Sequence, residues 1–451
     1  MLTRPRHRGV RFAGVIAALA MAAAAGTLLA PPASADTVRS TEAWVLSALN
    51  VQQAWSVTQG QGVVVAVIDS GVDSHVSDLT GQVHRGPDFT GVRTPPSSNF
   101  WGVHGTWMGS LIAGHGHGPG DASGIVGVAP QSKILSIRVI TDADDPNASA
   151  YERQSAPQGQ HELARAITYA VHHGASVISM SLGYSLQSAA VRAALQDAFT
   201  HNVVVVASAG NSGEQSGASG SGHAPYSFPA DYPGVLAVGA VTSAGQPASF
   251  SSENLSVQVA APGFQVPAQG RDGAYWLVSG TSPACALTAG VVALIKAKYP
   301  DLSDTKIISA IITSTTPGSR PKGGYNDRVG FGEVNAAAAL TTAGKLAGER
   351  AQPAGGLQPT AHFGGGTAAI PAPPVQSRGI GTLLLYCLLG VCCLGLVAVA
   401  VSRMFALHDR PGRRTAMPAD SAAESLVPRI TAGPPGRHAA PRIRGDDPAE
   451  Q

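Results

Sequence analysis

The stretch Val63–Asp73, VVVAVIDSGVD, is a run of β-branched residues that ends on an aspartate and a glycine-containing turn. Four further short apolar runs follow it along the chain: KILSIRVI (133–140), ASVISMS (175–181), NVVVVAS (202–208) and GVLAVGAV (234–241). Continuous apolar runs of this length are typical of strands that are covered on both faces, as in a parallel sheet. The five runs therefore predict a central sheet of buried, parallel strands.

The segments between these runs have helical periodicity. HELARAITYAVHHG (161–174) places apolar residues three and four apart and ends at a glycine, and SAAVRAALQDAFTHN (188–202) repeats the pattern. Strands that alternate with helices predict an α/β domain, with a doubly wound, mostly parallel sheet and helices on both faces. The acidic stretch DADDPNASAYERQ (142–154) is irregular, so we expect a solvated loop there, with a calcium site as the alternative.

Four polar residues lie where strands of this sheet end or where helices begin. Asp69 ends the first run, His104 precedes a small-residue helix in GVHGTWMGSLIAG, and Asn211 follows the fourth run in VASAGNSG. Ser282 stands before a proline and a long apolar helix in VSGTSPACALTAG. Taken singly, they suggest a capping aspartate, a surface histidine, a loop asparagine and a helix cap. Together they fall at the edge where an open α/β sheet binds ligands, and the order Asp, His, Ser is one of those known for a catalytic triad.

These stretches resemble the motifs of the subtilisin-like serine proteases, the subtilases. SMSLG (179–183) resembles the strand that lines the substrate cleft of that family, and VAAPG (259–263) and GFGEVNAAAAL (330–340) resemble its later framework. The resemblance implies a subtilisin-like fold and a serine endopeptidase. One departure is Ala286, because the family usually has a proline four residues after the nucleophile. We expect a slightly altered helix start there, with activity retained.

The resemblance also implies a role for each polar residue. Ser282 attacks a peptide carbonyl, His104 takes its proton and passes it to the leaving amine, and Asp69 orients the imidazole and stabilises its charged form. Asn211 donates its side-chain N–H to the developing oxyanion, beside the backbone N–H of Ser282. The polypeptide substrate is expected to lie extended along a cleft formed by Ser179, Ser181, Leu182, Gly183, Ser208, Ala209 and Gly210.

Little in the sequence points to a metal ion or to nucleic acid. His115 and His117 in GHGHGPG are flanked by glycines without nearby carboxylates, so we expect loop residues and not metal ligands. The resemblance implies that no cofactor is required, and structural calcium is left open. A net charge of only +2 gives no indication of a nucleic-acid partner.

Both ends of the chain carry signals for a membrane. Residues 1–35 combine arginines, an apolar run and a small-residue cleavage site, which predicts a secretory signal peptide, with an uncleaved signal anchor as the alternative. Residues 379–402 form an uncharged apolar run that predicts a transmembrane helix, the alternative being a buried core helix. Arginines are more numerous after this run than before it. The C-terminus is therefore expected to face the cytoplasm, and the peptidase domain the outside of the cell membrane.

These signals divide the chain into parts. The predicted peptidase domain, with a short N-terminal extension, covers 36–346, a Pro/Gly-rich stalk covers 347–378, and a disordered cytoplasmic tail covers 403–451. Cys285 is the one cysteine of the outer part, so no intrachain disulfide is expected there.

This architecture resembles the mycosins, membrane-anchored subtilases linked to type VII secretion systems of actinobacteria. The expected partners are a polypeptide substrate, the membrane and membrane proteins of a secretion complex. The alternative is a structural role, in which a subtilase fold stabilises the membrane secretion complex and proteolysis is secondary.

Overall fold

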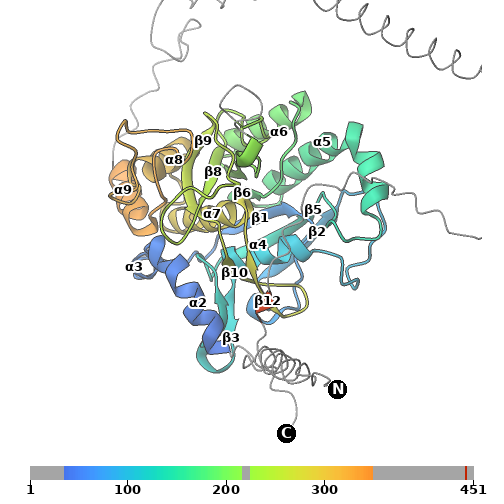
Figure 1. Cartoon of the computed structure of the whole chain (residues 1–451), viewed down its shortest axis with the longest axis horizontal. Coiled ribbons are helices and arrows are strands. Elements are labelled where there is room, and N and C mark those ends of the chain that lie inside the picture. The colour runs from blue at the N-terminus through green and yellow to red at the C-terminus, as the bar shows by residue number, and fades with distance from the viewer. Residues whose placement is uncertain (1–34, 216–223, 349–441, 444–451) are drawn as a thin grey trace, which may run out of the picture. The chain divides into compact units, whose positions relative to one another are not determined.

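A seven-stranded sheet lies at the centre of the computed structural model, which describes residues 35–215, 224–348 and 442–443 (Figure 1). The strand order is β2-β5-β1-β6-β7-β8-β9, and each neighbouring pair is parallel. The strands are β1 (Val64–Asp69), β2 (Val83–Asp88), β5 (Lys133–Arg138), β6 (Val177–Met180), β7 (Val204–Ser208), β8 (Leu236–Val241) and β9 (Val257–Pro262). The predicted parallel sheet is confirmed, because the five apolar runs form β1, β5, β6, β7 and β8.

The two edge strands do not come from these runs. β2 has the sequence VHRGPD and is half exposed, and its only neighbour in the sheet is β5. An edge strand tolerates a proline such as Pro87, because one side of the strand has no ladder to complete. A strand of this composition has no apolar pattern by which the sequence could reveal it.

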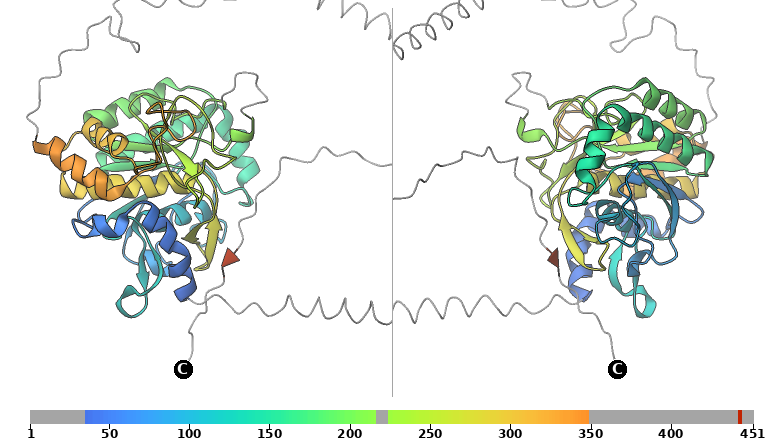
Figure 2. Two further views of the ribbon diagram at one scale, coloured as in Figure 1. Left: turned by 60° about the vertical axis from the view of Figure 1, so that its left-hand side comes forward. Right: turned by 90° about the vertical axis from the view of Figure 1, so that its right-hand side faces the viewer.

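Successive residues of β1 pack on opposite faces of the sheet. Val65 and Val67 belong to a core that includes residues of α4 (Val103–Ala113) and α7 (Thr281–Lys298). Ala66 and Ile68 belong to a second core with residues of α5 (Ala148–His172) and α6 (Ala189–Thr200). Figure 2 shows these helices on the two sides of the sheet. The molecule therefore has the subtilisin-like α/β architecture that the sequence predicts.

Smaller elements surround this layered centre. The remaining helices are α2 (Ala35–Ala48), α3 (Val51–Trp55), α8 (Asp304–Thr313) and α9 (Ala336–Gly348), with short 3-10 turns at Ser77–Leu79, Pro119–Asp121 and Gly213–Gln215. β3 (His115–His117) pairs with β4 (Ser123–Val126), and β10 (Val266–Gln269), β11 (Tyr275–Val278) and β12 (Arg442–Ile443) form an antiparallel sheet. β11 leads into α7 after two residues, so this small sheet directly precedes Ser282.

The expectation of a solvated loop at 142–154 is wrong in two respects. α5 begins at Ala148, so the second half of this stretch is helical. In the first half, Asp145 is 4% exposed and its Oδ2 accepts a hydrogen bond from Arg138 at 3.0 Å. The partner of this carboxylate comes from β5, so a reading of local polarity could not predict its burial.

Within the described ranges, no helix is both long and apolar enough to cross a membrane. The predicted span at 379–402 lies outside the described residues. The same holds for 1–34 of the predicted signal peptide, for 349–378 of the stalk, and for the predicted tail apart from 442–443.

Candidate active site

Three neighbouring strands end at one edge of the sheet. β1 ends on Asp69, β6 is followed by Ser181, and β7 leads into Asn211. The strands are adjacent and parallel, so residues at their carboxyl ends meet at this edge. His104 and Ser282 are the second residues of α4 and α7, two helices that pack together in one core. The residues that the sequence analysis selected therefore gather around one edge of the sheet.

The carboxylate of Asp69 holds the ring of His104. His104 Nδ1 lies 2.8 Å from Asp69 Oδ1 and 3.0 Å from Oδ2. Asp69 is fully buried, and its Oδ1 also accepts the backbone N–H of Ser70 at 2.7 Å. A carboxylate at Nδ1 places the imidazole proton on that nitrogen and leaves Nε2 as the basic nitrogen.

Opposing effects set the pKa of His104. Burial of the ring is the largest effect and lowers it, but the negative charge of Asp69, its hydrogen bond and the charge of Asp142 together raise it above its usual value of 6.5. The ring also meets Trp107 edge to face, with centroids 6.2 Å apart, and Trp107 in turn lies 6.0 Å from the ring of Trp276. Aromatic packing thus covers part of the imidazole.

Ser282 lies in the first turn of α7, behind a glycine in an unusual conformation. Gly280 has a φ of 155°, which a residue with a Cβ rarely adopts, and a Cβ there would lie 3.3 Å from Asn211 Nδ2. Ser282 Oγ donates to the carbonyl of Ser181 at 3.4 Å. Among the described contacts, Ser282 and His104 make no hydrogen bond with each other. In enzymes without substrate this bond is often long or poorly aligned.

Asn211 is oriented by the residue before Ser282. Its Oδ1 accepts the backbone N–H of Thr281 at 2.9 Å and the Thr281 hydroxyl at 3.0 Å. Thr281 Oγ1 in turn accepts the backbone N–H of Gly210 at 3.1 Å. Because Oδ1 is used in this way, the amide presents its Nδ2 on the side of Gly280.

The residues predicted to bind substrate are only partly accessible. The side chains of Ser179, Ser208 and Ala209 are buried behind the sheet edge, and Ser179 Oγ lies 3.7 Å from Cys285 Sγ. Ser181 and Leu182 are each 8% exposed, whereas Gly183 is exposed and Gly210 is partly exposed. Substrate contacts at this edge would therefore fall mainly to backbone groups.

The sequence analysis missed two residues that support this site. Asp142 accepts backbone N–H groups at the start of α4. Arg138 is 1% exposed and donates from Nε to the carbonyl of Ser70, next to Asp69. A long basic side chain at the end of a buried strand, followed by an acidic stretch, was the available signal for a buried ion pair.

The histidines of GHGHGPG take part in local hydrogen bonding. His117 Nδ1 lies 2.6 Å from Oδ1 of the fully buried Asp78, and His115 Nε2 lies 3.0 Å from the carbonyl of Thr80. They are the first and last residues of β3, so the expectation of loop residues without a nearby carboxylate is wrong, because β3 pairs with β4 and Asp78 comes from a distant part of the chain. Within the described part of the chain, no group of three or more His, Cys, Asp or Glu side chains is arranged to hold a metal ion.

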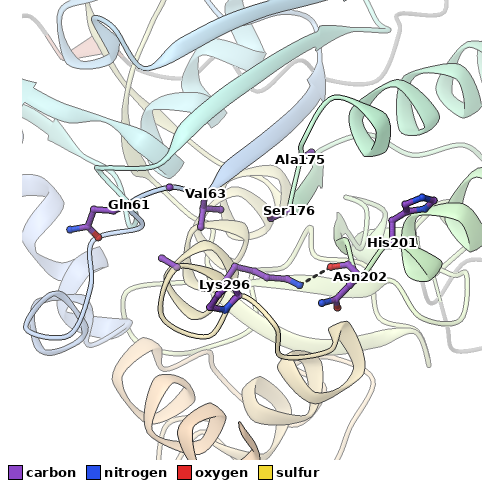
Figure 3. A pocket seen from close by; sticks show the side chains of 10 residues that line it. Gln61, Val63, Ala175, Ser176, His201, Asn202 and Lys296 are labelled. Carbon is purple, nitrogen blue, oxygen red and sulfur yellow. Dashed lines mark hydrogen bonds between the residues drawn. The ribbon is translucent and has the colours of Figure 1, made fainter.

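A polar cavity of about 370 Å³ lies at the opposite edge of the sheet, where β1, β6 and β7 begin (Figure 3). Lys296 lines this cavity and donates from Nζ to the carbonyl of Asn202 at 2.7 Å. Burial lowers the pKa of Lys296 to about 8. The cavity is separated from Asp69 by the length of β1, so it forms no part of the candidate active site.

Comparisons with known proteins agree with this geometry. Residues 60–332 match the subtilase family, Peptidase_S8. Subtilisin from Bacillus pumilus is 34% identical over 258 residues, which cover 57% of this chain and 85% of that protein. Among solved structures, the MycP3 protease from the type VII (ESX-3) secretion system is 31% identical, with a TM-score of 0.54 over 66% of this chain and 87% of MycP3.

A further similar structure is the periplasmic assembly from the ESX-5 inner membrane complex. The matching chain is 27% identical, with a TM-score of 0.56 over 73% of this chain and 89% of that one. The family match covers more than half of the chain, and the mycosins are among its structural relatives. This chain belongs to the subtilase family of serine endopeptidases.

Proposed function

We propose that this subtilase is a membrane-anchored, extracytoplasmic endopeptidase with Asp69, His104 and Ser282 as its triad. The observation that carries the proposal is the contact between His104 Nδ1 and Asp69 at the sheet edge where Ser282 lies in the first turn of α7. An imidazole held by a carboxylate at Nδ1 has the tautomer that takes a proton from a serine.

The reaction begins when Ser282 Oγ attacks the peptide carbonyl carbon and its proton passes to Nε2 of His104. For this step the hydroxyl must leave the Ser181 carbonyl, to which it donates at 3.4 Å, and turn toward the ring. The C–N bond then breaks, and His104 gives the proton to the leaving amine. Water, deprotonated by His104, hydrolyses the acyl-enzyme and restores Ser282. No organic cofactor enters these steps.

The developing negative charge falls on the carbonyl oxygen of the substrate. We assign Asn211 Nδ2 and the backbone N–H of Ser282 as its donors, because Thr281 holds the other end of the Asn211 amide. The N-terminus of α7 adds a partial positive charge beside the same oxygen. The extended polypeptide would pair with backbone groups near Gly183 and Gly210, the accessible members of the proposed cleft.

Labelling with a fluorophosphonate probe tests the triad directly. The detergent-solubilised full chain should be labelled, and Ser282→Ala should not be, because the probe bonds to the activated hydroxyl. A folded wild-type protein that stays unlabelled, or label that persists in Ser282→Ala, would contradict the proposal.

The proposed topology places a signal peptide at 1–35, the peptidase domain at 36–346, a stalk at 347–378, a membrane span at 379–402 and a cytoplasmic tail at 403–451. A cytoplasmic tail is incompatible with the pairing of β12 and β11 within one molecule, since the two would lie on opposite sides of the membrane. An epitope at the C-terminus distinguishes these arrangements. Protection from protease added to intact spheroplasts supports the topology, whereas digestion would put the tail on the outer side, where β12 could pair with β11.

For the cellular role, we propose processing of proteins that a type VII secretion system exports. Support comes from the likeness to MycP3, a protease named for such a system. The likeness to the ESX-5 periplasmic assembly favours a second candidate, a structural role in a membrane secretion complex. A deletion strain complemented with Ser282→Ala separates the two. If the strain with Ser282→Ala secretes normally but no longer processes the substrate, proteolysis is supported. If deletion abolishes secretion and Ser282→Ala restores it, the structural role is supported.

A further inference from the structure

Asp142 lies on the loop after β5 and accepts two hydrogen bonds from the first turn of α4. Its Oδ2 lies 2.9 Å from the backbone nitrogen of Val103, and its Oδ1 lies 2.8 Å from that of His104. Both carboxylate oxygens are therefore directed at the start of the helix that carries His104.

The helix has no local residue for this task. Its N-cap is Gly102, which has a φ of 73° and no side chain to accept a hydrogen bond. The first N–H groups of a helix have no partner within the helix and normally bind an N-cap side chain or water. Asp142 supplies this acceptor from another part of the fold, since it lies 40 positions after Gly102 in the sequence.

We propose that Asp142 is a positioning residue for the subtilase reaction. Asp69 holds the ring of His104, while Asp142 holds its backbone, so the imidazole is fixed at both ends. A general base must keep hydrogen-bond geometry to the serine to within a fraction of an ångström. The inference rests on the proposed role of His104 as the base.

The surroundings of His104 give the proposal an electrostatic consequence. The charged groups acting on the imidazole are Asp69 from β1 and Asp142 from the loop after β5. From α7, Cys285 interacts with Asp69, and its thiol stays neutral because burial raises its pKa to about 11. Arg271, from the turn between β10 and β11, binds the backbone of the loop ahead of α4. Removal of the Asp142 charge should therefore lower the pKa of His104.

Steady-state kinetics on the detergent-solubilised full chain test the proposal. Asp142→Asn keeps the shape but loses the charge and one acceptor, and Asp144→Asn removes the same charge from an exposed position on the same loop. We expect Asp142→Asn to lower kcat about tenfold with little change in KM, and to move the acid limb of kcat/KM to lower pH by about half a unit. Asp142→Glu, which keeps the charge and both oxygens, should recover part of kcat.

If Asp142→Asn matches Asp144→Asn in kcat and in the position of the acid limb, the inference is overturned. A variant that merely loosened the fold would lower the labelled fraction at every pH without moving the limb. Fluorophosphonate titration of active sites and a thermal melt for each variant identify that case.

A second readout does not depend on catalysis. NMR titration of the His104 ring in histidine-labelled protein should give a lower pKa in Asp142→Asn than in the wild type. An unchanged ring pKa would refute the contact even in an active enzyme. If the ring pKa shifts but the fluorophosphonate does not label the protein, the contact between Asp142 and His104 is supported. The proposed endopeptidase function is then contradicted instead.

Discussion

Asn211 illustrates how a residue of the candidate site is oriented by a neighbour in space that is remote in sequence. Its Oδ1 accepts both the backbone N–H and the hydroxyl of Thr281, so its Nδ2 is left for the proposed contact with the substrate oxyanion. An amide that was free to rotate would present either atom. The Gly-Thr-Ser sequence at the start of α7 therefore serves two purposes in the proposed site, since it contains the proposed nucleophile and orients the proposed donor.

We predict that Asn211→Ala lowers kcat by about 10²–10³ with little change in KM, because the lost N–H acts mainly on the charged intermediate. That magnitude comes from subtilisin itself. Thr281→Val, which removes one of the two donors to Asn211, should lower kcat by a smaller factor, about tenfold. Peptide hydrolysis normalised to fluorophosphonate-titrated sites measures both. Equal kcat in Asn211→Ala and the wild type would exclude Asn211 from the oxyanion site.

The raised pKa of His104 predicts the direction of the pH profile. His104 must be neutral to take the Ser282 proton, so kcat/KM should rise with pH and reach half its maximum above 6.5. Asp69→Asn removes the charge that raises this pKa, and the acid limb should move to lower pH while kcat falls by about 10⁴. If the acid limb of the kcat/KM profile has the same position in Asp69→Asn as in the wild type, a group other than His104 is responsible for that limb.

At the scale of single elements, the end of β5 is fixed by one buried arginine. Arg138 donates from its guanidinium to Asp88 and Asp145 and from Nε to the carbonyl of Ser70. β5 pairs with β1 so that Arg138 lies opposite Asp69. These contacts thus tie β2, the residue after β1 and the end of the β5–α5 loop together beside the site.

Arg138→Met should lower the free energy of unfolding by about 3–5 kcal/mol, because Asp145 would then be buried without its charged partner. The matched control is Arg328→Met, which breaks the more exposed pair with Glu253 and should cost about 0–1 kcal/mol. Urea denaturation of the two variants measures the difference. Similar losses in both would show that Asp145 is solvated or finds another donor.

Elements differ in how far the sequence reveals them. The runs at β1, β5, β6, β7 and β8 are buried on both faces, so nearly all their residues are apolar and the pattern is plain. β2 and the first half of α5 were not predicted, since one is a half-exposed edge strand and the other has little apolar periodicity. Their places depend on partners elsewhere in the chain.

At the scale of the whole molecule, the N-terminal helix α2 is attached through a buried carboxyl group. Glu42 is 2% exposed, and its two oxygens each lie 3.1 Å from the backbone nitrogen of Val126 in β4. Burial is the main cause that raises the pKa of Glu42 from 4.5 to about 8, while the Val126 hydrogen bond and Arg39 act in the opposite direction. Glu42 is therefore neutral in the folded protein at pH 7.

This carboxyl group predicts a pH dependence of stability. Below pH 4.5 it is protonated in both states, whereas between about 4.5 and 8 it ionises only in the unfolded chain, so rising pH favours unfolding. The slope from this group is at most about 1.4 kcal/mol per pH unit. Glu42→Gln should flatten the dependence between pH 5 and 8, as measured by urea denaturation. Parallel curves for the two proteins would mean that Glu42 ionises freely in the folded state.

The sequence by itself determined the parallel α/β fold and the family, because buried strands must be apolar throughout and because the motifs around Asp69, His104, Asn211 and Ser282 are short and local. It could not determine which groups hold these side chains. Asp142, Arg138 and Glu42 are ordinary charged residues in the sequence, and they are significant only because folding removes them from water beside particular backbone groups. The energy of a buried ionisable group depends on its neighbours in three dimensions, so only the tertiary structure decided their roles.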